Sequence, residues 1–166
     1  MDDLYVECLV ARKPLPAETL IKGAAWGAAA LCLLLGVLNI LFIVPFIVIA
    51  AADFFLLPRL SVEYEYLYVS RSLQIDRIYS KQDRKKAVEY DLEQMEIFAE
   101  EGAWQLDEFK NMKTVDRDFT SGMPGRSVWV LIAHNGQQID RVRLEPNTEM
   151  TEAIRSIYPR KTFKRS

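Results

Sequence analysis

The side chains that could do chemistry are few in this chain of 166 residues. The one histidine, His134, directly precedes an Asn-Gly pair, so we expect it to face solvent beside a turn rather than act in catalysis. A lone histidine without a neighbouring cysteine or second histidine does not make a zinc site. The sequence has no glycine-rich nucleotide-binding loop and no Gly-x-Ser-x-Gly elbow. We therefore predict that the protein is not an enzyme and has no catalytic residues, cofactor or metal.

Carboxylates are numerous, but they are spread along the chain rather than paired. One group follows a predicted strand and its exit, which favours a solvated acidic surface over an acid–base pair: Glu89, Asp91, Glu93, Glu96, Glu100 and Glu101. The only cysteines are Cys8 and Cys32, and Cys32 lies inside an apolar stretch. This excludes a disulfide framework and is consistent with a cytoplasmic domain.

Basic residues form two candidate binding clusters. The first lies in a predicted loop, and the second stands near the end of the sequence: Lys81, Arg84, Lys85 and Lys86, then Arg160, Lys161, Lys164 and Arg165. Near an anionic leaflet each such residue contributes about 1 kcal/mol within a Debye length of the surface. Two interpretations stay open, namely contact with anionic lipid headgroups and ordinary solvated charge. Residues 59–166 hold 18 basic and 18 acidic side chains, so this neutral region does not predict a nucleic-acid partner.

An apolar stretch near the N-terminus predicts a membrane anchor. Between Gly23 and Pro58 the only charged residue is Asp53, and one spanning helix needs only about 20 residues. We predict a two-helix transmembrane hairpin with helices at 19–37 and 40–57, joined near Gly36–Asn39. The alternative is one long, steeply tilted helix. The resulting divisions are an N-terminal segment (1–18), the hairpin (19–58) and a soluble domain (59–166).

The charges around this stretch predict its orientation. Basic residues flank the hairpin on both sides and are absent from its turn: Arg12, Lys13 and Lys22 before it, Arg59, Arg71 and Arg77 after it. By the positive-inside rule we expect a multi-pass protein of the cell membrane with both termini in the cytoplasm. A secretory signal peptide fits poorly because Asp2, Asp3 and Glu7 replace a basic start.

Small residues recur four apart in the first predicted helix, as Gly23 and Gly27 beside Ala24 and Ala28. This spacing lets helix backbones approach closely. It is explained either by packing of the two helices of the hairpin or by formation of a homodimer. For Asp53 we expect a side chain that reaches the headgroups, with an ion pathway as the alternative.

The segment before the hairpin places Leu4, Cys8 and Ala11 on one helical face. We therefore expect a short amphipathic helix, ended by Pro14 and Pro16, that lies on the membrane or on the soluble domain.

The soluble domain shows strand patterns followed by one helix. We predict strands at 62–69, 73–79, 86–92, 114–120, 127–134 and 138–144, with a mixture of strand and turn in 93–112. Asn135-Gly136 marks a hairpin turn, and Pro146-Asn147-Thr148 begins a helix that ends near Tyr158. The fold class is thus a mainly β domain of about seven antiparallel strands with a C-terminal helix.

This arrangement resembles the bacterial PH-like domains that follow a two-helix membrane hairpin, in a family of small, uncharacterised bacterial membrane proteins. The resemblance rests on VEYEYLYVSRSLQIDRIYSKQDRKKAVEYDL, on WVLIAHNGQQIDRVRLEP, on the closing helix and on the opening YVECLVARK. It implies a partly open barrel of two packed sheets. We expect a membrane-tethered, non-enzymatic scaffolding module with an unknown protein partner; the alternatives are a sensor of anionic lipid headgroups and a non-catalytic transporter subunit.

Overall fold

The computed structural model describes residues 5–57, 60–79 and 83–165. It divides into two compact units, which are described separately. We call residues 13–62 and 79–83 the helical pair, and the remaining residues the β domain.

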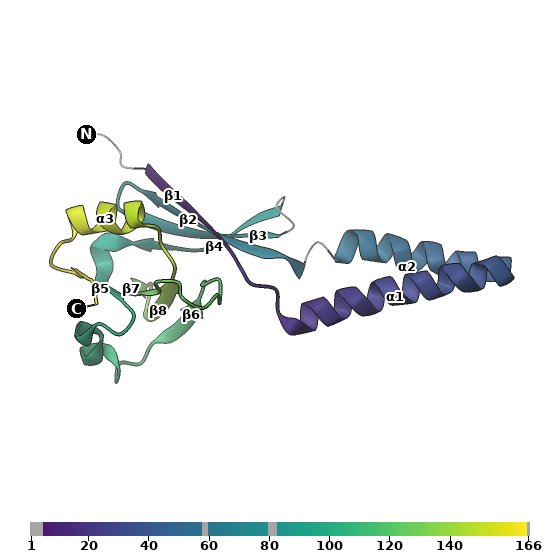
Figure 1. The fold of residues 1–166 in the computed structure, drawn as a ribbon. Helices are drawn as coiled ribbons and strands as arrows, with labels where there is room; N and C mark the ends of the chain where they lie inside the picture. Colours follow the sequence, from purple (N-terminus) through teal and green to yellow (C-terminus); the bar gives the residue numbers. More distant parts are fainter. Residues whose placement is uncertain (1–4, 58–59, 80–82, 166) are drawn as a thin grey trace. The chain divides into compact units, whose positions relative to one another are not determined.

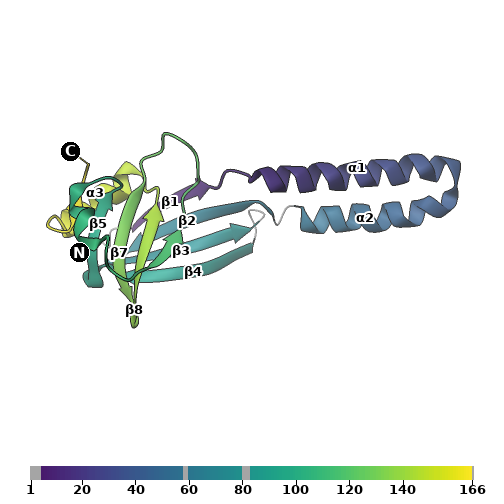
Figure 2. The same cartoon turned by 90° about the horizontal axis from the view of Figure 1, so that it is seen from below.

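The helical pair consists of α1 (Pro16–Leu38), the short 3-10 helix η1 (Ile40–Phe42) and α2 (Ile43–Leu56). α1 and α2 lie side by side and run in opposite directions (Figures 1 and 2). The chain reverses at Asn39, whose backbone is extended and whose side chain accepts a hydrogen bond from the Leu41 N–H at 3.0 Å. The two predicted helices are therefore present, and the turn between them lies at 39–42 rather than at 36–39.

Apolar side chains cover the outside of the helical pair. Leu34, Val37 and Phe54, for example, are 68%, 83% and 75% exposed. Of the described helices, α1 is the one whose length and composition would let it cross a membrane.

Sheet A of the β domain has the strand order β1-β2-β3-β4, formed by Tyr5–Ala11, Val62–Val69, Ser72–Tyr79 and Asp83–Asp91. The predicted amphipathic helix at the N-terminus is wrong, because β1 pairs antiparallel with β2 from Tyr5↔Val69 to Ala11↔Glu63. Val6, Cys8 and Val10 alternate along β1 and are buried, so the segment follows the two-residue period of a strand. Tyr5–Ala11 thus belongs to the β domain.

Sheet B has the order β6-β8-β7-β5-β9, with the strands Val115–Asp118, Gln138–Leu144, Trp129–Asn135, Met95–Glu100 and Thr162–Phe163. The expectation of purely antiparallel strands is wrong here, because β6 pairs parallel with β8 and β5 pairs parallel with β9. The predicted hairpin is confirmed: β7 and β8 pair antiparallel up to Asn135↔Gln138, and Gly136 has φ 63°.

The remaining elements close the β domain. Helix α3 (Thr148–Ile157) is capped by Asn147, whose side chain accepts from the Met150 N–H at 2.8 Å. The ambiguous stretch 93–112 forms β5 and the 3-10 helix η4 (Trp104–Phe109), and η3 (Leu92–Gln94) precedes β5. Figure 2 shows β7 and β8 crossing the strands of sheet A, and no pairing between described strands closes the two sheets into one barrel.

The core of the β domain lies on both faces of sheet B. Residues Trp129–Ala133 of β7 are all buried, which requires cover on each side of the strand. One face carries a cluster of buried apolar side chains from β5, β7 and η4: Ile97, Ala99, Ala103, Leu106, Val130 and Ile132. On sheet A, Tyr64, Tyr66 and Tyr68 are buried together, as their alternation predicts.

A buried carboxylate links the two sheets. Asp140 of β8 is fully buried, and its Oδ2 accepts hydrogen bonds from Tyr90 Oη (2.7 Å), Arg117 Nε (2.7 Å) and Asn135 Nδ2 (2.9 Å). Burial alone would raise the pKa of Asp140, but these three donors and the charge of Arg117 outweigh it and lower the pKa. The aspartate is thus held as a charged connector between β4, β6 and β8.

Candidate functional site: a groove along strand β1

A groove of about 470 Å³ opens on the β domain beside β1. Four consecutive residues of β1 form one wall. The opposite wall comes from the loop before β7 and from the connection between β8 and α3, so that the complete lining is Glu7, Cys8, Leu9, Val10, Arg126, Ser127, Glu145, Pro146, Asn147 and Thr148. We call this the β1 groove.

Strand β1 has a free edge. It stands at the end of sheet A, and β2 is its one neighbour in the sheet. In the described part of the chain, Tyr5–Ala11 makes no main-chain hydrogen bond outside the ladder with β2. A strand edge of this kind presents unpaired N–H and C=O groups that can pair with another extended chain.

Buried hydrogen bonds hold Glu145, one of the residues that line the groove, in place. The Tyr66 hydroxyl donates to the Phe119 carbonyl at 2.7 Å and accepts from the Glu145 N–H at 3.3 Å. Glu145 Oε1 accepts from the N–H and the hydroxyl of Ser121 at 3.0 and 2.9 Å. Tyr66 is completely buried, and burial strongly raises the pKa of its phenol, so the hydroxyl stays protonated and can donate.

The groove carries both signs of charge. Glu7 stands on its β1 wall, where one carboxylate oxygen accepts from the Tyr5 hydroxyl at 2.9 Å, and Arg126 stands on the other wall. Glu145 is 5% exposed, and its Oε2 is buried without a hydrogen-bond partner. The thiol of Cys8 contacts the Glu145 carbonyl at 3.8 Å, and burial raises its pKa despite the nearby Asn147 N–H and Arg126. Cys8 is therefore a packing residue rather than a reactive thiol.

Carboxylates also gather on the outer face of sheet A. Glu65 of β2 and Asp76 of β3 are each only 2% exposed. Arg84 NH2 bonds Glu65 Oε1 at 2.7 Å, whereas Glu65 Oε2 is buried without a partner. Burial raises the pKa of Glu65 and Glu7 raises it further, whereas Arg84 lowers it, so the buried carboxyl group of Glu65 lies between an acidic neighbour on β1 and a basic one on β4.

The first predicted basic cluster is only partly free. Lys81 lies outside the described residues, and Arg84, Lys85 and Lys86 are exposed at the start of β4. Arg84 pairs with Glu65 and Lys86 pairs with Glu89, which leaves Lys85 without an ion pair in the described structure.

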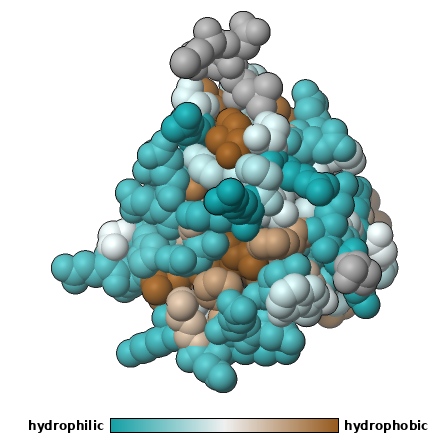
Figure 3. Space-filling view, turned by 90° about the vertical axis from the view of Figure 1, so that its left-hand side faces the viewer, coloured by the Kyte–Doolittle hydropathy of each residue, from teal (hydrophilic) through white to brown (hydrophobic). Residues whose placement is uncertain are grey.

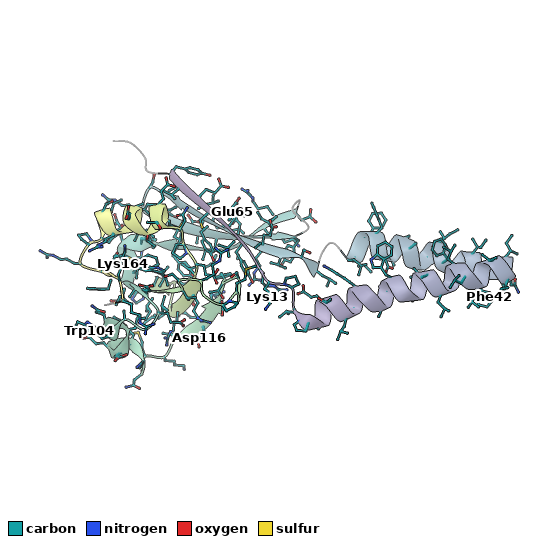
Figure 4. The ribbon with its side chains drawn as sticks, viewed as in Figure 1. Lys13, Phe42, Glu65, Trp104, Asp116 and Lys164 are labelled. Carbon is teal, nitrogen blue, oxygen red and sulfur yellow. The ribbon has the colours of Figure 1, made fainter. Side chains whose placement is uncertain are left out.

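The second predicted cluster is also partly engaged in structure. Lys161 Nζ donates to the Met95 carbonyl at 2.6 Å, and the Arg165 N–H donates to Glu100 at 3.0 Å. Arg160 and Lys164 are exposed, and neither forms a salt bridge within the described chain. In Figure 4, Lys164 lies apart from Glu65, the acidic partner of the first cluster. The face of the β domain shown in Figure 3 is mainly hydrophilic, with small hydrophobic areas.

The small-residue face of α1 points away from α2. Ala24 and Ala28 are exposed, and a Cβ built at Gly23 or at Gly27 would meet nothing within 4 Å. In contrast, a Cβ at Gly36 would lie 3.1 Å from Cγ1 of Ile43. Gly23 and Gly27 thus have no close neighbour on α2 in this structure, and the packing role of the small residues stays a prediction.

The single histidine of the chain pairs with a neighbouring strand. His134 lies within β7 rather than in the turn, and its Nε2 lies 2.9 Å from Glu96 of the neighbouring strand. Among the described residues, no three or more histidine, cysteine or acidic side chains converge in a way that could hold a metal ion.

The sequence pattern did not reveal the groove. The alternation of Val6, Cys8 and Val10 was available as a strand signal, but Tyr5 and Leu9 are also large and apolar, which blurs the two-residue period. Glu145 and Arg126 come together with β1 only through tertiary contacts between distant segments.

Two crossing sheets closed by a C-terminal helix define a PH-like β domain. The chain matches the family described as Bacterial PH-like domain (DUF6106) over residues 2–164. It belongs to this family, and the match includes both β1 and the helical pair. No curated protein and no solved structure matches the chain significantly.

Proposed function

We propose that this protein is a non-enzymatic binding module, tethered to the cell membrane by the helical pair, which presents the β domain to a protein partner at the cytoplasmic face. The observation that carries the proposal is the β1 groove, an open site of about 470 Å³ beside an unpaired strand. Its volume lies in the range of ordinary ligand sites. The buried hydrogen bonds of Glu145 support a preformed wall rather than one that must be assembled on binding.

The helical pair supports a membrane tether. The 23 residues of α1 extend about 35 Å at 1.5 Å per residue, which exceeds the roughly 30 Å of a bilayer core. The stretch 40–56 extends about 26 Å, close to the lower limit for a span. Together with the basic flanks, these lengths favour a multi-pass hairpin with both termini in the cytoplasm.

The test is copurification with the full-length protein in mild detergent. Arg126→Trp should fill the groove from its exposed wall, and Lys110→Trp places the same side chain at an exposed site in a different loop. A partner that is recovered with the unaltered protein and with Lys110→Trp, but lost with Arg126→Trp, supports the proposal. No recovery of any partner, or equal recovery with both variants, contradicts it.

A second candidate function is binding of anionic lipid headgroups. It is favoured by Lys85, Arg160 and Lys164, which are exposed and have no salt bridge in the described structure. Reconstitution of the full-length protein in neutral and in anionic nanodiscs tests it. Slower hydrogen exchange at 84–86 or 160–165 in the anionic discs alone is the expected result, and identical exchange in both contradicts it.

The exposed small-residue face of α1 favours a homodimer as one form of the tether. Gly23, Ala24, Gly27 and Ala28 form a flat surface that α2 leaves uncovered. A second copy of α1 could approach this surface closely.

A further inference from the structure

The main-chain edge of β1 forms a wall of the β1 groove. Glu7, Cys8, Leu9 and Val10 are consecutive residues, and their side chains alternate between the two faces of sheet A. Because residues from both faces of the strand line the groove, the main chain of β1 must itself form part of this wall. The free N–H and C=O groups of this edge are therefore available to a chain lying in the groove.

We infer that the partner enters the β1 groove as an extended peptide that adds a strand to the free edge of β1. This inference rests on the proposed function and specifies the partner of the same site. Strand addition of this kind obtains affinity from main-chain hydrogen bonds and specificity from alternate side chains. Between Tyr5 and Ala11 there is no proline or lysine, the residues that commonly protect an edge strand from such pairing.

Charge on the outer face of β1 determines what the added strand carries. Tyr5, Glu7 and Leu9 point outward, and Tyr5 and Leu9 are 57% and 55% exposed. Glu65 and Asp76 of the neighbouring strands are buried, and Arg84 pairs with Glu65, so Glu7 is the exposed carboxylate that a strand added to β1 would meet. Directly opposed residues on neighbouring strands interact most strongly, and opposite charges there are favourable.

The partner segment should therefore place an apolar residue beside Leu9 and a lysine or arginine beside Glu7. These two positions are two residues apart, so an antiparallel partner reads apolar-x-basic. The residue between them points to the inner side of the groove, where Arg126 and Glu145 both stand, so an uncharged hydroxyl side chain suits this position.

The test uses a defined probe with the full-length protein in detergent. The probe is the blocked peptide Thr-Thr-Val-Thr-Lys-Thr-Val, and a matched peptide has glutamate in place of its lysine. The lysine peptide should slow amide hydrogen exchange in residues 5–11, because new main-chain hydrogen bonds protect the edge of β1. It should bind about five- to tenfold more tightly than the glutamate peptide.

A charge swap provides the decisive arm. Glu7→Lys should reverse the preference, so that the glutamate peptide binds more tightly, whereas Glu108→Lys makes the same charge change at an exposed residue of η4 and should leave the preference unchanged. Absence of peptide binding, equal affinity of both peptides, or binding without protection of residues 5–11 would overturn strand addition. A partner that copurifies through the groove but is insensitive to Glu7→Lys would leave the proposed function standing and reject this inference alone.

Discussion

Two tyrosines on one strand provide a test of the hydrogen bonds that hold Glu145 beside the groove. Tyr66 and Tyr68 of β2 are both completely buried, and both face the core. The Tyr66 hydroxyl bridges the Phe119 carbonyl and the Glu145 N–H, whereas the Tyr68 hydroxyl is buried without a hydrogen-bond partner. The same substitution, tyrosine to phenylalanine, therefore removes two hydrogen bonds at one position and none at the other.

The expected effects follow from this difference. Tyr66→Phe leaves a buried carbonyl and a buried N–H unsatisfied, at about 1 kcal/mol each, so it should lower the free energy of unfolding by about 2 kcal/mol. Tyr68→Phe removes a hydroxyl whose burial is uncompensated, so it should leave stability unchanged or raise it by up to about 1 kcal/mol.

Native-state hydrogen exchange of the full-length protein in detergent measures both variants. Amides of β2 and β8 report the free energy of opening the β domain, and the helical pair acts as an internal reference. The reasoning is refuted if Tyr68→Phe destabilises as much as Tyr66→Phe, or if Tyr66→Phe has no effect.

Three further predictions concern other parts of the chain. Asp140→Asn should lower the stability of the β domain by about 2–3 kcal/mol at pH 7, measured by denaturation, because it removes the charge that Arg117 and Tyr90 contact. The pKa of Asp140 is lower in the folded state, so its contribution to the free energy of unfolding is complete above the unfolded pKa near 4 and is lost as the pH falls through the folded pKa. Asp140→Asn should therefore make stability fall less steeply with decreasing pH. An unchanged pH dependence would contradict this. Gly27→Leu should weaken self-association in bilayers without unfolding the helical pair, as measured by energy transfer between labelled copies. Gly36→Leu should instead disturb the packing of α1 on α2, because its side chain would meet Ile43. Loss of association with Gly36→Leu alone would exclude the small-residue face as the dimer interface. Tags at both ends and at residue 39 should show the ends inside and the turn outside in intact cells, and ends on opposite sides would reject the hairpin.

Local patterns predicted most of the β domain because each depends on neighbours in sequence. The alternating tyrosines of β2, the Asn135-Gly136 turn and the capped helix after Pro146 all carry their own signal. Strand direction was predicted less well. The parallel pairs β6–β8 and β5–β9 join segments with a helix or other strands between them, and no local residue pattern encodes those contacts.

The basic clusters show why charge runs in a sequence overestimate binding sites. Lys161 looked like a tail residue free to meet lipid, yet its ammonium group lies on the Met95 carbonyl. Arg84 similarly contacts the buried Glu65. A cation of this kind satisfies a buried acceptor, and only the fold reveals the acceptor.

The position of the helical pair in the chain explains how a free edge strand can be retained. The pair is inserted between β1 and β2, which are neighbours in sheet A, and the last pair of their ladder is Ala11↔Glu63. Both connections to the helices therefore begin at one end of a single two-strand ladder. A slip of β1 by one residue along β2 would turn Val6, Cys8 and Val10 out of the core. The chain connection that follows Ala11 also opposes such a slip. Pairing with β2 thus holds β1 in register, while the other edge of β1 stays unpaired. A partner strand would therefore meet a preformed edge, and binding would cost little conformational entropy beyond that of the partner itself.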